Sequence, residues 1–377
     1  MSALITYLTT IRLGEGAIAE IGEDLAQCGI ERALIVADAG VVAAGLVDRV
    51  VAHLPADSVA AVFDATPSNP TQTAAEQALA VYRETGAGGL IAIGGGSPID
   101  LAKAVALMAT HDGPFEEYAA ILGGVPRITS AVAPVIAVPT TAGTGSEVGR
   151  AALVTLVDGR KLGFVSPHLI PKRAICDPEL TYGMPPGLTA ATGMDAISHC
   201  IETYLSPRFN PPAEAIALDG LARAVVNLPR AVADGADVGA RREMMIAALH
   251  GGLTFQKGLG AIHAISHPLG GLEDPSLHHG TLNAVLLPHV LRFNEPAAEE
   301  KYATMRRVIG LDAGADLAAF FDTLNGEIGM PKTLSDMGLP RQAIPPVVDG
   351  ALKDHSVPTN PRDLDRTAVE GLIEAAY

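Results

Sequence analysis

Cysteine is scarce in this chain: its 377 residues include Cys28, Cys176 and Cys200, and none of the three belongs to a CxxC pair. Three scattered cysteines do not build a disulfide framework, so we expect reduced thiols and a cytoplasmic location. No apolar run reaches the roughly 18 residues that a membrane-spanning helix needs. The first residues also lack the basic and apolar segments of a signal peptide. The sequence therefore predicts a protein without a membrane partner.

Charge is limited as well. Charged residues make up 18% of the chain and the formal net charge is −16. A net negative surface repels phosphate backbones, so we expect no nucleic-acid partner. Hydrophobic residues make up 48% of the chain, which is typical of a globular protein and not of a disordered one. At about 150 residues per domain, the length favours two or three domains.

The two halves of the chain carry different patterns. In the first half, short apolar runs alternate with helical patterns, which indicates a parallel sheet buried on both faces. The runs cover 33–37, 58–63, 90–93 and 135–138, and two of the helical patterns cover 73–85 and 100–109. From about Pro186 the patterns are long and helical. We predict an α/β dinucleotide-binding domain with a Rossmann-like sheet over 1–185 and an all-α domain over 186–377, with a hinge at 185–187.

A glycine-rich loop, Gly94–Asp100, directly follows the apolar run 90–93. Ser97 is a natural N-cap, Pro98 suits the first helical position, and Asp100 completes a pattern that resembles a capping box. Free N–H groups at the start of such a helix favour an anion such as a pyrophosphate. A well-capped helix without a ligand explains the same residues equally well.

Two more loops follow apolar runs. Asp38 closes the run 33–37, where a carboxylate can bind ribose hydroxyls and repel a 2′-phosphate, which favours NAD over NADP. Asp38 precedes the glycines instead of following them, and a plain turn residue is the alternative. The loop Pro139–Glu147 is dense in hydroxyls and small residues and could bind phosphate or the nicotinamide amide, or be only a turn. Together the loops favour a nucleotide site.

Histidines and one aspartate are spaced as metal ligands in the second half. Asp195 and His199 are four residues apart in a helical pattern, and so are His263 and His267, which places each pair on one helix face. His278 and His279 follow, and His289 comes later. Imidazole and carboxylate groups are the usual ligands of Zn²⁺ and Fe(II). Any one histidine alone is more often a packed or surface residue, but the set favours a metal site.

These motifs resemble the iron-dependent (group III) alcohol dehydrogenase family, within the superfamily that includes dehydroquinate synthase. The resemblance spans almost the whole chain, and its stretches occur in the order of the family. They are Gly94–Lys103, Pro139–Glu147, Asp177–Leu180, Thr192–Glu202, Gly258–Gly271, His279–Pro288 and Thr359–Arg362.

The resemblance implies a role for several residues. It makes Asp195, His199, His263 and His279 the ligands of one divalent metal, with His278 as the rival of His279. It makes His267 the proton relay, a role that suits a side chain titrating near neutral pH. It implies cofactor contacts by Asp38, Asn69, Gly95, Gly96, Ser97, Asp100, Thr140, Thr141, Thr144 and Lys161. Fe(II) is the expected metal, with Zn²⁺ as the alternative, and a homodimer or larger homo-oligomer is the expected assembly.

The predicted function is NAD(H)-dependent interconversion of a short-chain alcohol or hydroxy acid with its aldehyde or ketone. The alternative is a lyase or cyclase of the dehydroquinate synthase type, which also uses NAD and a metal. Its anionic substrate requires several Lys and Arg residues, and the ligand-bearing segments 192–204 and 258–290 are poor in them. A third reading, a scaffold that binds metal and nucleotide without catalysis, leaves the pairing of these two sites without a use.

Overall fold

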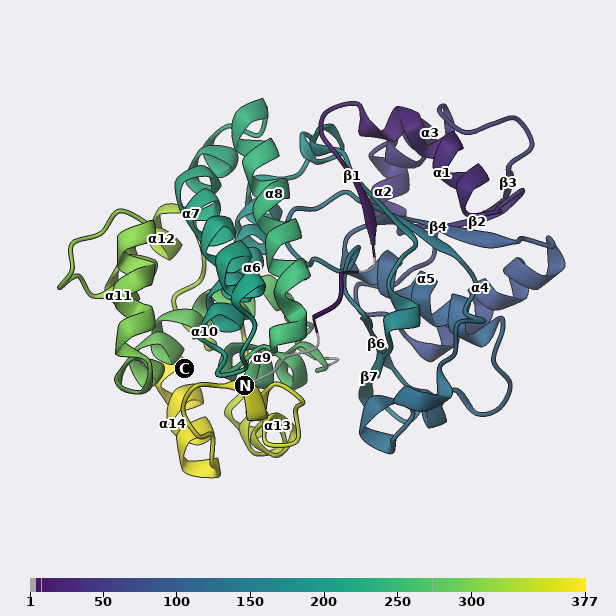
Figure 1. Ribbon diagram of the computed structural model, residues 1–377. Coiled ribbons are helices and arrows are strands. Elements are labelled where there is room, and N and C mark those ends of the chain that lie inside the picture. The colour runs from purple at the N-terminus through teal and green to yellow at the C-terminus, as the bar shows by residue number, and fades with distance from the viewer. Residues whose placement is uncertain (1–4, 8, 273) are drawn as a thin grey trace. The chain divides into compact units, whose positions relative to one another are not determined.

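The structure is a computed structural model that describes residues 5–7, 9–272 and 274–377. The chain divides into two compact units, which are described separately (Figure 1). An α/β unit comprises Tyr7–Thr141 and Gly145–Gly183, whereas Ala142–Thr144 groups with the helical unit formed mainly by Met184–Tyr377. Among the described residues, no helix has both the length and the apolar character needed to cross a membrane.

The α/β unit is built on a six-stranded sheet in the order β1-β8-β5-β4-β2-β3. Every neighbouring pair in this sheet is parallel. The strands are β1 (Thr10–Leu13), β2 (Ala33–Val36), β3 (Val59–Phe63), β4 (Gly89–Gly94), β5 (Val135–Pro139) and β8 (Arg173–Cys176). The parallel sheet confirms the predicted fold class. The apolar pattern did not predict β1 and β8. Strand β1 is short and half polar, and β8 is short and comes late in the unit.

The central strands are apolar on both faces because helices cover both. On β2, Leu34 and Val36 point into one core, and Ala33 and Ile35 point into another. Helices α4 (Gln72–Glu84) and α5 (Gly96–Met108) supply the first core. Helices α1 (Ile21–Gln27), α2 (Ala39–Ala43) and α3 (Leu46–Val51) supply the second. The burial of alternate residues on opposite faces explains why these strands read as unbroken apolar runs.

Three of the predicted cofactor segments directly follow adjacent strands of the sheet. The chain runs from β2 outward to β3, then returns to place β4 on the other side of β2. The strand order therefore reverses between β2 and β4, and open α/β sheets bind ligands at the carboxyl ends of strands at such a point. Asp38 follows β2, Gly95 follows β4, and Thr140 follows β5, the next strand. The topology thus gathers these loops at one edge of the sheet.

A two-stranded antiparallel hairpin, β6 (Ala151–Thr155) and β7 (Lys161–Val165), joins this unit through α5. Lys103 of α5 is fully buried, and its Nζ donates to the carbonyls of Ser146, Gly149 and Ala151 at 2.7, 3.1 and 2.8 Å. One ammonium group thereby fixes the course of the chain from the second loop into β6.

The start of α5 differs from the prediction. Gly95, not Ser97, is the N-cap, and it provides no side-chain cap. Ser97 lies in the first turn and its Oγ donates to the carbonyl of Ser68 at 2.6 Å. Asp100 does not close a capping box, because its oxygens accept from Ser146 Oγ at 2.5 Å and from the backbone N–H of Leu153 at 2.9 Å. The expected capping pattern was wrong because the side chains of Ser97 and Asp100 bind partners that are distant in the sequence.

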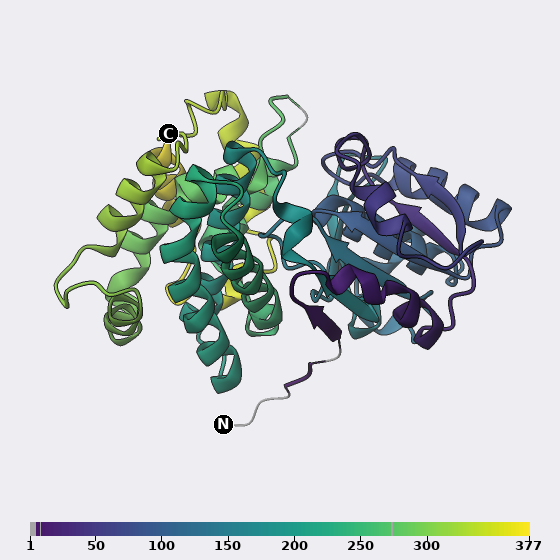
Figure 2. The ribbon, with the colours of Figure 1, turned by 90° about the horizontal axis from the view of Figure 1, so that it is seen from above.

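The helical unit has one continuous core. Its helices are α6 (Pro186–Leu205), α7 (Pro211–Ala233), α8 (Val238–Thr254), α9 (Ala261–Gly270), α10 (His279–Asn294), α11 (Glu299–Val308), α12 (Leu317–Glu327), α13 (Ile344–Ala351) and α14 (Arg366–Ala376). In both views the green-to-yellow part of the chain consists of helices and connecting loops (Figure 1, Figure 2). The expected hinge at 185–187 is the start of α6, since Pro186 occupies its first position. Helix α6 is buried over most of its length and contacts α7, α8 and α10.

Candidate metal centre and nucleotide loops

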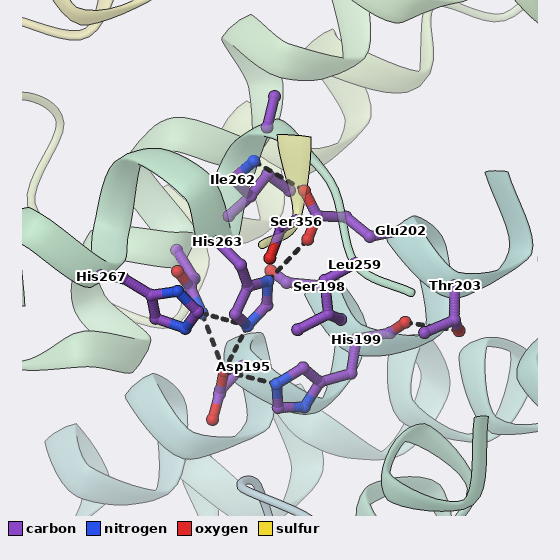
Figure 3. A network of polar contacts seen from close by, with 12 residues as sticks. Asp195, Ser198, His199, Glu202, Thr203, Leu259, Ile262, His263, His267 and Ser356 are labelled. Carbon is purple, nitrogen blue, oxygen red and sulfur yellow. Dashed lines mark hydrogen bonds and ion pairs between the residues drawn. The ribbon is translucent and has the colours of Figure 1, made fainter. Parts of the chain in front are cut away.

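One carboxylate and three imidazoles converge inside the helical unit. Figure 3 shows Asp195 with two of these imidazoles, those of His199 and His263. Asp195 Oδ1 lies 3.4 Å from Nε2 of His199 and 3.6 Å from Nε2 of both His263 and His279. The ligating atoms of Asp195, His263 and His279 all lie within 4.8 Å of one another. Asp195, His199 and His263 are buried, while the side chain of His279 is 34% exposed. The structure therefore brings these four side chains together, and their role as metal ligands stays a prediction.

Three helices supply these side chains. Asp195 and His199 are one turn apart on α6, His263 lies in α9, and His279 is the first residue of α10. Gly280 lets α10 approach α6 closely, because a Cβ at this position would lie 2.2 Å from the carbonyl oxygen of Ala191. A glycine directly after His279 is thus required for the His279 side chain to reach Asp195.

Two further side chains hold the cluster, and neither was predicted from the sequence. Glu202 of α6 is buried; its Oε2 lies 2.6 Å from Nδ1 of His263, and its Oε1 accepts from the N–H of Ile262 at 2.6 Å. Asn283 of α10 is also buried and donates from Nδ2 to Asp195 Oδ1 at 2.8 Å. A signal existed for both, since Glu202 follows His199 by three residues and Asn283 follows His279 by four.

The charges of the cluster suit a cation. Burial raises the pKa of Asp195, but the facing His199, His263 and His279 outweigh it and lower that pKa well below its usual range. Burial lowers the pKa of His199 to about 4, which leaves a neutral imidazole at neutral pH. Burial also acts to lower the pKa of His263, but Glu202 and Asp195 together raise it to about 9. The two buried carboxylates therefore attract positive charge to this point, and either protons or a metal ion can supply it.

The residues fit a divalent metal on the chemistry of the donor set. Three imidazole nitrogens and one carboxylate oxygen are ligands that Fe(II) and Zn²⁺ accept. Because the carboxylate of Glu202 only accepts hydrogen bonds, Nδ1 of His263 carries its proton and Nε2 faces Asp195. A partner on the outer nitrogen of this kind orients a ligating histidine.

The other histidines lie differently. His278 is exposed and is the N-cap residue of α10; within the described residues it takes no part in the cluster around Asp195. His289 lies further along α10. His267 is one turn after His263 on α9, its ring stacks on that of His279 at 5.6 Å, and its Nδ1 lies 2.8 Å from Asp354 Oδ2. The geometry therefore places His267 beside the ligand set and not in it.

The nucleotide loops offer two features that suit a ligand. Asp38 caps α2, with Oδ1 accepting from the N–H of Val41 at 2.9 Å. Thr141 Oγ1 is buried and has no hydrogen-bond partner among the described residues. A Cβ at Gly95 would lie 3.2 Å from this hydroxyl, so the glycine keeps the space beside it open. An unpaired hydroxyl facing a side-chain-free loop at a sheet's switch point fits a bound phosphate or amide.

The remaining predicted cofactor residues are distributed as follows. Lys161 of β7 donates to Asn69 Oδ1 at 2.9 Å, and burial lowers the pKa of Lys161. The backbone N–H of Thr140 donates to the carbonyl of Gly94 at 3.0 Å, which joins the two loops. Thr144 lies in the short segment that groups with the helical unit. The structure therefore brings together Asn69 with Lys161 and the loop 94–96 with 140–141.

Comparisons with known proteins place this arrangement in a family. The model for "Iron-containing alcohol dehydrogenase" matches residues 9–178, and the model for the C-terminal part of the same family matches residues 189–377. A 4-hydroxybutyrate dehydrogenase of Cupriavidus necator is 52% identical over 99% of both chains. A 1,3-propanediol dehydrogenase of Klebsiella pneumoniae is 37% identical over 97% of this chain and 96% of its own.

Solved structures agree. The crystal structure of a 1,3-propanediol oxidoreductase has a TM-score of 0.93 at 36% identity and covers all of both chains. A sulfoacetaldehyde reductase of Bifidobacterium kashiwanohense in complex with NAD⁺ has a TM-score of 0.90 at 30% identity, over 100% of this chain and 99% of its own.

The fold and the relatives are those of metal-dependent oxidoreductases of alcohols and aldehydes. The chain belongs to the iron-containing alcohol dehydrogenase family. This membership confirms the predicted reaction class and decides against the lyase and the non-catalytic scaffold.

Proposed function

We propose that Asp195, His199, His263 and His279 bind one Fe(II) ion and that the enzyme oxidises a short ω-hydroxy acid with NAD⁺. The observation that carries the metal assignment is the approach of three imidazole Nε2 atoms to within 3.6 Å of Asp195 Oδ1. When bound, the metal supplies Lewis acidity for an alcohol oxygen, and the nicotinamide supplies the hydride acceptor.

The chain's own residues perform the remaining tasks. Glu202 keeps Nε2 of His263 directed at the ligand set, and Asn283 does the same for Asp195 by donating to its Oδ1. His267 accepts the proton that the alcohol releases, because it adjoins His279 without belonging to the ligand set.

The cofactor proposal is NAD in preference to NADP. Asp38 uses Oδ1 to cap α2, and we propose that its Oδ2 binds the ribose hydroxyls. The negative charge then opposes a 2′-phosphate. Gly95, Gly96, Ser97, Thr140 and Thr141 surround the pyrophosphate and the nicotinamide amide, and the Asn69–Lys161 pair borders them. Support comes from the unpaired hydroxyl of Thr141 and from the NAD⁺ complex of the related sulfoacetaldehyde reductase.

The substrate proposal is 4-hydroxybutyrate and its aldehyde. It is supported by the 52% identity to the 4-hydroxybutyrate dehydrogenase of Cupriavidus necator, against 37% for the propanediol enzyme and 35% for the lactaldehyde reductase of Escherichia coli. We further propose that the enzyme works in the cytoplasm as a homodimer, a state that sedimentation of the purified protein tests.

The test is a kinetic panel. The protein is stripped with a chelator, reloaded with Fe(II) or Zn²⁺, and assayed with NAD⁺ on 4-hydroxybutyrate, 1,3-propanediol and 1,2-propanediol. We expect one metal equivalent per chain, the highest turnover with Fe(II), and the highest kcat/KM for 4-hydroxybutyrate. A higher kcat/KM for either diol would reject the proposed substrate, and activity that survives complete metal removal would reject the metal.

A further inference from the structure

Helix α9 carries two histidines that are each held by a carboxylate from a different part of the chain. His263 Nδ1 lies 2.6 Å from Glu202 Oε2, and His267 Nδ1 lies 2.8 Å from Asp354 Oδ2. In both pairs the second carboxylate oxygen accepts a backbone N–H: Ile262 donates to Glu202 at 2.6 Å, and Ser356 donates to Asp354 at 2.8 Å. The first pair belongs to the ligand set, whereas the second has no assigned task.

Asp354 is held firmly in place. It follows α13, its backbone N–H donates to the carbonyl of Ala351 at 3.1 Å, and its side chain is 11% exposed. A few residues later, Asn360 Oδ1 accepts from the N–H of Ala261 at 3.1 Å. The segment from Asp354 to Asn360 therefore contacts α9 both at its first residue and at His267.

The contact determines which nitrogen of His267 carries the proton. An ionised carboxylate only accepts, so Nδ1 must be the donor and Nε2 of the neutral ring keeps its lone pair. The other groups around this ring are His279 on one face at 5.6 Å, His355 at 5.6 Å and His263 at 5.6 Å. With Nδ1 committed to Asp354, Nε2 is the atom of His267 that remains for proton exchange.

We infer that Asp354 is a positioning residue that fixes the tautomer and the ring orientation of His267, so that Nε2 accepts the proton released by the alcohol. The inference rests on the proposed relay function of His267. In the step, the O–H bond of the alcohol breaks and an Nε2–H bond forms, while the proton on Nδ1 stays on nitrogen and donates to Asp354. The resulting imidazolium faces a carboxylate that stabilises its charge.

The test compares three variants of the Zn²⁺-loaded enzyme: His267→Gln, Asp354→Asn and the double variant. General acid–base groups contribute about 10²–10⁴-fold, so His267→Gln is expected to lower kcat by about 100-fold. Asp354→Asn should lower kcat nearly as much with KM unchanged, because its amide can donate to Nδ1 and favour the other tautomer. The double variant should be no slower than His267→Gln alone, since Asp354 acts through that ring.

Selective ¹⁵N labelling of histidine gives a readout independent of activity. The His267 signals are assigned by their loss in His267→Gln; we expect the proton on Nδ1 in the unmodified enzyme and a population protonated on Nε2 in Asp354→Asn. The matched control is Asp349→Asn, since Asp349 lies on the neighbouring α13 and pairs with Arg366 on the surface. It should change neither kcat nor the tautomer.

The outcomes separate this inference from the proposed function. If His267→Gln leaves kcat unchanged, the relay role itself is wrong. If His267→Gln is slow while Asp354→Asn keeps both the tautomer and kcat, Asp354 is not the positioning residue. Multiplicative losses in the double variant, or a second metal equivalent that disappears in Asp354→Asn, would also overturn the inference, because His267, Asp354 and His355 lie close enough to hold an ion.

Discussion

At the scale of single residues, the neighbouring histidines at positions 278 and 279 provide a matched pair. His279 Nε2 lies 3.6 Å from Asp195 Oδ1, while His278 is the exposed residue that precedes α10. We expect His279→Gln to weaken metal affinity by about 100-fold or more and to abolish turnover with it. His278→Gln should retain one metal equivalent and normal kcat. Titration of the stripped proteins with Zn²⁺ checks both, and a reversed pattern would move the ligand to position 278.

Asp38 supports a second prediction at this scale. Asparagine caps a helix as well as aspartate does, so Asp38→Asn keeps the contact with the N–H of Val41 and removes only the charge. Loss of the repulsion should raise the ratio of kcat/KM for NADP⁺ to that for NAD⁺ by about 10-fold, which corresponds to ~1.4 kcal/mol. Steady-state kinetics with both cofactors measure the ratio. An unchanged ratio would mean that Asp38 serves α2 alone.

At the scale of elements, the segment between the second loop and β6 contains a buried acid with consequences for stability. Glu147 is 2% exposed, and burial raises its pKa from 4.5 to about 7, although the nearby Lys103 opposes the shift. The folded protein thus binds this proton more tightly than the unfolded chain. The contribution to stability is complete below pH 4.5 and is lost as the pH rises to about 7.

We therefore expect Glu147→Gln to gain stability relative to the unmodified protein as the pH rises from 5 to 8. A shift of this size corresponds to at most about 3 kcal/mol in the free energy of unfolding. Urea unfolding at several pH values measures the difference between the two proteins. Glu84→Gln, an exposed position on α4 of the same unit, is the control and should show no such trend. A constant difference across this range would contradict the raised pKa.

The same scale shows what the sequence could and could not predict. The apolar runs predicted β2, β3, β4 and β5 to within a residue or two. Strands β2, β4 and β5 are buried on both faces and so admit only apolar side chains, whereas β3 is an edge strand that is apolar but only partly buried. The i, i+4 spacing predicted that Asp195 and His199 share a face of α6. The capping of α5 was wrong because Asp100 turns to Ser146 and Leu153, partners that no local pattern reveals.

Contacts between residues that are distant in the sequence limit how much of the site can be predicted from the sequence. Glu202 reaches His263 over 61 positions and Asp354 reaches His267 over 87, so only the packing of α6 and of the segment after α13 against α9 shows which carboxylate holds which ring. The motif Thr359–Arg362 is part of the family resemblance, and the structure gives its physical reason. Asn360 binds Ala261 and Asn294, so the motif secures the start of the helix that carries both histidines.

At the scale of the whole molecule, the proposed metal joins helices that are distant in the sequence. Its ligands come from α6, α9 and α10, which share one core. A ligand that binds only the folded state stabilises it by about 2.7 kcal/mol at 100 times its Kd. For a unit of about 190 residues, this corresponds to a rise in Tm of roughly 5–10 °C.

We accordingly expect chelation to lower the Tm of the unmodified protein by that amount and to increase amide exchange in α6, α9 and α10 above that in the α/β unit. Asp195→Asn should show the lower Tm from the outset and no response to added metal, whereas His278→Gln should respond in full. Because the α/β unit has its own cores, its strands should keep their protection after chelation. Equal loss of protection in both units would show that the ion stabilises the fold as a whole and not the helical unit that binds it.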